Sequence, residues 1–305
     1  MKISIKRLQN DLCNVFAERE KFGTQFKNFI FIAVTGLLAL CSCSNDNNEQ
    51  IPENDPRPMT FVARYGDVLV TRANIDYRPN MVDKVRFDSH DIISILSSNN
   101  ANVLFTSGNG GDKALFTGTA VNDSKFYAIF PYTIGLALSG TTITGVRIPP
   151  SQWNDVWSIV GGSYSYCDPK APIAWAQTTD TDLTFHNLCA FLKIHTTGPD
   201  HGGGWGSITI SADQSLAGTF SLDTSTGTLT ATAGRTSVTI GEDDPQSLNK
   251  VCQRHFLYIA IAPGTYSNFT IVSKGVSGLT KTKKSETSAT FEAGRIYDFG
   301  DFAIQ

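Results

Sequence analysis

Short runs of β-branched and aromatic residues recur about every ten residues along this chain, and Gly, Asn, Asp and Pro separate them. Beyond residue 58, no stretch keeps helical periodicity for more than about two turns. Strands at this spacing without intervening helices form antiparallel sandwiches, whereas a parallel α/β sheet needs crossover helices. The pattern therefore predicts an all-β fold.

The composition agrees with a protein of strands and turns. The 305 residues include 32 Thr, 26 Gly and only 3 Met, and Thr suits pleated surfaces while Gly suits turns. The apolar fraction of 41% is sufficient for a core, and the length favours two domains over one. The net charge of −3 argues against nucleic acid as a partner, since such binding needs a basic surface.

The N-terminal segment has the features of a signal peptide. Its apolar run, Phe29–Cys41, is shorter than the roughly 20 residues of a transmembrane helix and suits the apolar part of a signal. The sequence Leu40-Cys41-Ser42-Cys43 resembles the lipobox of bacterial lipoproteins, which implies cleavage before Cys43 and acylation of its thiol. Cys41 is the rival lipidation site, and an ordinary secretory signal with a chance cysteine is the alternative.

Four segments follow from these boundaries. We expect a lipoprotein signal peptide with a long n-region over residues 1–42 and a polar tether over 43–58. Residues 59–180 and 181–305 are then the N-terminal and C-terminal sandwich domains, and the boundary falls in an irregular stretch, 147–182.

Two series of strands are predicted. The loop between two strands of the first series, Ser107–Asp112, is a hairpin signal because its residues accept positive φ. The first series is Thr60–Ala63, Val68–Thr71, Asp91–Leu96, Val103–Thr106, Ala114–Thr119 and Lys125–Phe130. The second series is Leu183–Thr196, Ser207–Ser211, Gly218–Leu222, Gly227–Ala231, Ser237–Ile240, Phe256–Ile261, Asn268–Ser273, Ala289–Phe291 and Ile296–Ile304.

Motifs for catalysis or metal binding are absent from the sequence. There is no HExxH, no Gly-x-Ser-x-Gly elbow and no phosphate-binding glycine loop. Besides Cys43, the chain beyond the signal has Cys167, Cys189 and Cys252, none in a CxxC spacing, and we expect Cys189 and Cys252 to be buried. The sequence therefore predicts no enzyme, no cofactor and no metal site.

The four tryptophans gather in and near the irregular stretch, at Trp153, Trp157, Trp175 and Trp205. Exposed aromatic rings stack on sugars, so one hypothesis is a glycan-binding platform. The other interpretation, which we favour, is that these side chains fill the seam between the two domains or cover the end of a sandwich.

Three strand motifs, together with the lipobox, carry a family resemblance. Phe126-Tyr-Ala-Ile-Phe-Pro-Tyr132, Leu183–Ile194 and Gly294-Arg-Ile-Tyr-Asp-Phe299 stand in this order after Met59-Thr-Phe61 and Thr71-Arg-Ala73. This arrangement resembles the fimbrillin-like family of surface lipoproteins of anaerobic Gram-negative bacteria, and the match covers most of the chain beyond the signal.

The resemblance implies two transthyretin-like β-sandwich domains in a fimbrial subunit that is exported to the outer-membrane surface and then enters the fimbrium. In such a family an arginine-specific protease removes the first strand, and a strand from another subunit replaces it. Carried onto this chain, the expected scissile bond is Arg72–Ala73, and Arg64 is a weaker candidate. Because the sequence stops directly after Ile296–Ile304, we expect no separate donor segment, which favours a tip, minor or anchor subunit with an adhesive ligand on a host or bacterial surface, unless the last strand is itself the donor. The alternative function is a monomeric lipoprotein that binds glycan through the tryptophans.

Anchoring can be tested at the lipobox. We expect Cys43→Ala to release the protein from the membrane fraction and to abolish labelling by radioactive fatty acid, because the thiol that carries the acyl chains is gone. Persistent labelling of this variant would move the lipid to Cys41 or contradict the lipoprotein interpretation.

Overall fold

The structure, a computed structural model, describes residues 55–66, 87–152, 154–158, 165–169, 173–197, 205–241, 256–275 and 278–303. Within these ranges the structure contains β-strands and no helix. The prediction of an all-β chain is therefore confirmed.

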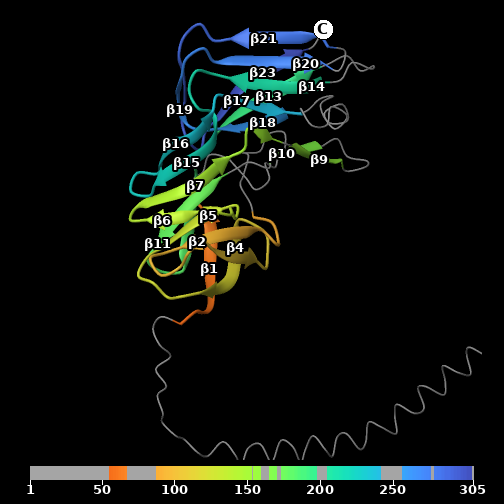
Figure 1. Cartoon of the computed structure of the whole chain (residues 1–305). Coiled ribbons are helices and arrows are strands. Elements are labelled where there is room, and N and C mark those ends of the chain that lie inside the picture. Colours follow the sequence, from red (N-terminus) through yellow and green to blue (C-terminus); the bar gives the residue numbers. More distant parts are fainter. Residues whose placement is uncertain are drawn as a thin grey trace, which may run out of the picture. The chain divides into compact units, whose positions relative to one another are not determined.

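The first sheet closes on itself. Its order is β1-β12-β11-β5-β2-β3-β4, and β4 pairs back to β1. In Figure 1, β1 is the orange strand beside β4. The strands are β1 (Arg57–Tyr65), β2 (Ile92–Leu96), β3 (Val103–Ser107), β4 (Lys113–Ala120), β5 (Phe126–Phe130), β11 (Ala174–Thr178) and β12 (Asp182–Asn187).

The remaining strands form smaller sheets. Their orders are β18-β13-β23, β21-β20-β14-β17-β8, β16-β15-β7-β6, β19-β22 and β10-β9. The strands are β6 (Ala137–Ser139), β7 (Thr142–Ile148), β8 (Ser151–Gln152), β9 (Asn154–Ser158), β10 (Ser165–Pro169), β13 (Ala190–Thr197), β14 (Trp205–Ser211), β15 (Ala217–Asp223), β16 (Thr228–Arg235), β17 (Ser237–Ile240), β18 (Phe256–Ile261), β19 (Gly264–Tyr266), β20 (Thr270–Gly275), β21 (Thr280–Lys284), β22 (Ala289–Phe291) and β23 (Ile296–Ala303).

Two apolar cores share three strands. All five residues of β5 are buried: Phe126, Ala128 and Phe130 enter the core of the closed sheet, and Tyr127 and Ile129 enter the second core. Since successive side chains of a strand point to opposite faces, β5 has a core on each face. Strands β2 and β11 divide their side chains between the same two cores. This explains why the sequence of β5 is apolar without alternation.

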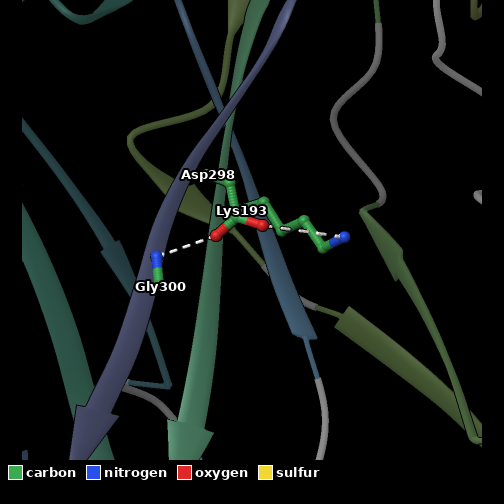
Figure 2. A network of polar contacts seen from close by, with 3 residues as sticks. All are labelled: Lys193, Asp298 and Gly300. Carbon is green, nitrogen blue, oxygen red and sulfur yellow. Dashed lines mark hydrogen bonds and ion pairs between the residues drawn. The ribbon is translucent and has the colours of Figure 1, made fainter.

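The last described strand, β23, pairs in parallel with β13. Figure 2 shows Lys193 of β13 beside Asp298 of β23, with 3.9 Å between Lys Nζ and a carboxylate oxygen. The other carboxylate oxygen of Asp298 accepts a hydrogen bond of 2.8 Å from the amide of Gly300, whose φ of +65° favours glycine. This strand is therefore held within its own chain.

Several strand predictions need correction. Leu183–Thr196 is two strands, β12 and β13, which belong to different sheets. The chain leaves the first sheet at Leu188, whose amide donates to the Ile173 carbonyl, and Cys189 accepts from the amide of Gly294. The stretch predicted as irregular, 147–182, contains β8, β9, β10 and β11 and the end of β7. The predicted hairpin at Ser107–Asp112 is confirmed, since β3 and β4 flank it and pair antiparallel.

Strand pairing crosses the expected domain boundary at residue 180. Strand β12 joins the closed sheet, while β7 pairs with β15 and β8 pairs with β17. The division into residues 59–180 and 181–305 remains a prediction, and a cut there would separate hydrogen-bonded strands.

Candidate functional site

The strand β1 closes the first sheet by pairing on both of its edges. It is antiparallel to β4, with Phe61 opposite Phe116, and parallel to β12, with Ala63 opposite Leu183. At the β12 edge the amide of Val62 donates to the Thr181 carbonyl at 2.8 Å. We call the facing edges of Lys113–Ala120 and Asp182–Asn187 the β1 seat. Without β1, both edges of the seat would have unpaired backbone groups.

The side chains of β1 alternate between core and solvent. Phe61 and Ala63 have no exposed surface, whereas Thr60 and Arg64 are exposed and Val62 is half-buried on the outer face. Phe61 therefore anchors the strand in the core of the closed sheet. Burial of one such aromatic side chain contributes about 1.5–3 kcal/mol.

Aromatic contacts surround Phe61. Its ring centroid lies 5.3 Å from that of Phe105 and 5.2 Å from that of Phe126, both in edge-to-face geometry. On β4 this packing requires Gly118, because a Cβ there would lie 2.7 Å from the Phe105 ring. Phe61 thus packs edge-to-face against two aromatic rings in the core of the closed sheet.

The C-terminal end of β1 carries a buried hydroxyl. The Tyr65 ring stacks on Phe87 with 4.7 Å between centroids, and its hydroxyl oxygen is buried without a hydrogen-bond partner. Burial, with a smaller contribution from the Asp91 carboxylate, raises the pKa of Tyr65 well above its usual value. An unpaired buried hydroxyl destabilises the seated strand.

The two arginine candidates differ in their placement. Arg64 lies inside β1, exposed on its outer face and in register with Lys113 on one side and Thr184 on the other. Its backbone lies between two paired strands, so a protease, which binds an extended substrate through backbone hydrogen bonds, finds neither edge of Arg64 free. Arg72 and Ala73 lie outside the described residues, as does Cys43.

The expected glycan platform is only partly described. Trp175 is 9% exposed and belongs to the second core, so its faces are covered by protein. The interpretation that the tryptophans fill the seam between the domains or cover the end of a sandwich stays a prediction. Trp157 lies on β9 opposite Tyr166, and Trp205 begins β14, but their side chains, like all of Trp153, lie outside the described residues.

The remaining sequence candidates have structural roles or no described role. Cys189 is fully buried, as predicted, and burial raises the pKa of its thiol to about 12. Within the described ranges, no group of three or more His, Cys, Asp or Glu side chains is placed to hold a metal ion. In the same ranges, no helix has the length and apolar character needed to span a bilayer.

The sequence did not reveal the parallel partner of β1. The hairpin loop at Ser107–Asp112 is a local sequence signal for one antiparallel pair, β3 with β4, because it joins these two strands directly. Strand β12 is more than 110 positions away from β1, and no turn motif links the two.

Truncation of Phe61 tests the contribution of this side chain. We expect Phe61→Ala to lower the free energy of unfolding by about 3–5 kcal/mol, because it removes the ring packed on Phe105 and Phe126. Thr60→Ala, at the exposed neighbouring position, should change it by less than about 0.5 kcal/mol. Urea unfolding followed by tryptophan fluorescence measures both, and equal effects would contradict the seating of β1.

The Tyr65 hydroxyl gives a prediction of opposite sign. Tyr65→Phe should raise the free energy of unfolding by about 1–3 kcal/mol at neutral pH, since it removes a buried group without a partner. A folded-state pKa raised above the unfolded value also means that wild-type stability is lost as the pH rises above about 10. Part of this alkaline loss should be missing in Tyr65→Phe. Tyr297→Phe is the control, because the Tyr297 hydroxyl accepts a hydrogen bond from the Glu292 amide and its removal should not stabilise the protein.

Comparison with known proteins gives structural neighbours only. No family model matches the chain, and no curated protein matches it. A "putative cell adhesion protein" from Bacteroides uniformis has a TM-score of 0.47 and 16% identity, over 81% of this chain and 93% of that one. Another from Bacteroides ovatus has a TM-score of 0.45 and 12% identity, over 82% and 93%. A fimbrial assembly protein from Parabacteroides distasonis has a TM-score of 0.37 and 10% identity, over 81% and 91%.

These neighbours are named as adhesion and fimbrial proteins, the class to which the sequence motifs showed a resemblance. Because every identity is low and every TM-score is below 0.5, the function proposed below is derived from the pairing of β1 in this chain.

Proposed function

We propose that this protein is a subunit of a cell-surface fimbrium and that it assembles when a strand from another subunit replaces β1. The observation that carries the proposal is the position of β1, the first described strand, which pairs along both edges and joins β4 to β12 in the closed sheet. A strand at the beginning of a domain can leave without breaking the order of the strands that follow.

Removal of β1 would create a binding site for an extended segment. The six strands that remain of the seven would form an open sheet with edges at β4 and β12. Between these edges the pocket of Phe61 and the small space above Ala63 would be open. An extended segment satisfies such edges by its backbone hydrogen bonds, and alternate side chains fill the pockets. The expected donor carries a large apolar residue followed, two positions later, by a small one.

Cleavage at Arg72–Ala73 supplies the trigger in this proposal. The bond lies between Gly66, the residue after β1, and Phe87, where the described chain resumes. A cut there separates β1 from the body of the subunit and lies outside the seven described strands of the closed sheet. The nicked strand stays seated through its hydrogen bonds and Phe61 until a donor competes with it.

The remaining parts of the proposal concern location and role. Acylated Cys43 anchors the precursor in the outer membrane, and the trimmed subunit enters the fimbrium as a tip or minor component that mediates adhesion. The alternative, a monomeric glycan-binding lipoprotein, now rests on Trp153, Trp157 and Trp205, because Trp175 is part of the core.

Limited proteolysis followed by strand capture tests this function. Trypsin should cut the folded protein after Arg72 before it cuts after Arg64, since the Arg64 backbone is paired on both sides. Mass spectrometry identifies the first cut. Arg72→Ala should prevent that cut and leave the melting temperature unchanged, and Arg64→Ala is the matched control that should be cut as the wild type is.

The cut protein should then exchange its strand. We expect a fluorescent peptide of residues 57–66 to bind the cut protein and not the intact protein or Arg72→Ala. The same peptide with Phe61→Lys should not bind, because a charge would enter the apolar seat. Absence of capture by cut protein would contradict strand exchange and leave the plain surface-lipoprotein function in its place.

A further inference from the structure

The strand β16 is an edge strand without the usual protection of sheet edges. Among the described strands it pairs only with β15, at one end of the order β16-β15-β7-β6. It has eight residues, and the four consecutive residues Thr230–Ala233 are exposed. From Thr224 to Gly234 the sequence has no charged residue and no proline. Such an edge is open to pairing with another strand.

Three other edge strands, β6, β8 and β21, are protected. Strands β6 and β8 are only three and two residues long. Strand β21 has the sequence Thr-Lys-Thr-Lys-Lys, and Lys274 follows on the adjacent strand β20. Short edge strands and edge lysines are the ordinary devices against strand pairing between molecules. Strand β16 has neither device from Thr228 to Gly234, which leaves its edge suited to pairing.

The pattern of β16 is complementary to itself. In an antiparallel pair centred on Thr230, Thr228 of one copy lies opposite Thr232 of the other, and Leu229 lies opposite Ala231. From Thr228 to Ala231, β16 pairs with β15 in a regular register. The bulge in the pairing of β16 with β15 lies at Thr232. No like charges meet in this register, since Arg235 falls opposite Ser225.

Threonine pairs of this kind already stabilise the fold. The hydroxyl oxygens of Thr209 and Thr239, on β14 and β17, lie 3.0 Å apart, and those of Thr265 and Thr290, on β19 and β22, lie 2.9 Å apart. Cross-strand Thr–Thr pairs are favourable in antiparallel sheets. The same contact would form at the axis between the Thr230 side chains of two copies of β16.

We propose that β16 is an interface between two copies of this chain, which pair antiparallel about a two-fold axis at Thr230 and join two four-stranded sheets into one. The interface does not involve β1, so it is independent of strand exchange. It buries less area than a standard protein interface of about 1,600 Å², so the isolated pair is weak and depends on concentration.

Association of the purified full chain tests the proposal. Light scattering from about 10 μM to about 1 mM should show the mass rising toward that of a dimer. Thr230→Lys should remain monomeric over this range, because two lysines would meet at the axis. Thr144→Lys is the matched control: Thr144 is an exposed threonine of the same sheet, but β7 is paired on both sides, so association should be unchanged.

Cross-linking decides the register. Residues opposite each other in an antiparallel pair have Cα atoms about 4.5–5.5 Å apart, within the range of a disulfide. Thr230→Cys should therefore form a covalent dimer on mild oxidation, well above the level of the wild type and of Thr144→Cys. Cross-linking of Thr230→Cys no greater than that of Thr144→Cys would overturn the proposal, and so would association that Thr230→Lys leaves unchanged.

Discussion

The backbone groups along β4 and β12 need partners, and β1 supplies them on both sides. This requirement governs the first sheet, because every strand of the closed ring has two neighbours, and without β1 strands β4 and β12 would each have only one. The hydrogen bonds fix the direction and register of β1, and Phe61 fixes its depth in the core. A strand held mainly by edge hydrogen bonds and one aromatic anchor can be replaced by another strand with the same features, whereas β5, buried on both faces, cannot. The proposed assembly follows from this difference.

The two cores make the exchange tolerable for the rest of the protein. Strands β2, β5 and β11 contribute side chains to both cores. The second core therefore holds these three strands in place in addition to the core of the closed sheet. Loss of β1 would remove Phe61 and Ala63 from one core and nothing from the other. The unpartnered hydroxyl of Tyr65 reduces the stability of the seated strand further. These features together describe a sheet in which one strand is less firmly held than the strands around it.

Much of the fold could be predicted from the sequence because its signals are local. The glycine-rich loop at Ser107–Asp112 identified a hairpin, and the apolar run at Phe126–Phe130 identified a buried strand. The break at Leu188 and Cys189 could not be predicted, since both residues are apolar and continue the pattern of the strand before them. Trp175 and the parallel pairing of β1 with β12 depend on contacts between distant segments, for which one sequence holds no signal. Of the candidate site, the sequence therefore identified the strand at Thr60–Ala63 but not the two strands that seat it.

Amide hydrogen exchange measured residue by residue, before and after removal of β1, tests the central claim most directly. The account predicts that β4 and β12 amides are protected in the intact protein and exchange much faster once β1 is gone. The amides of β13 and β18, in another sheet, should keep their protection. If β4 and β12 stay protected after β1 has been removed, β1 does not close the sheet, and strand exchange at this position is wrong.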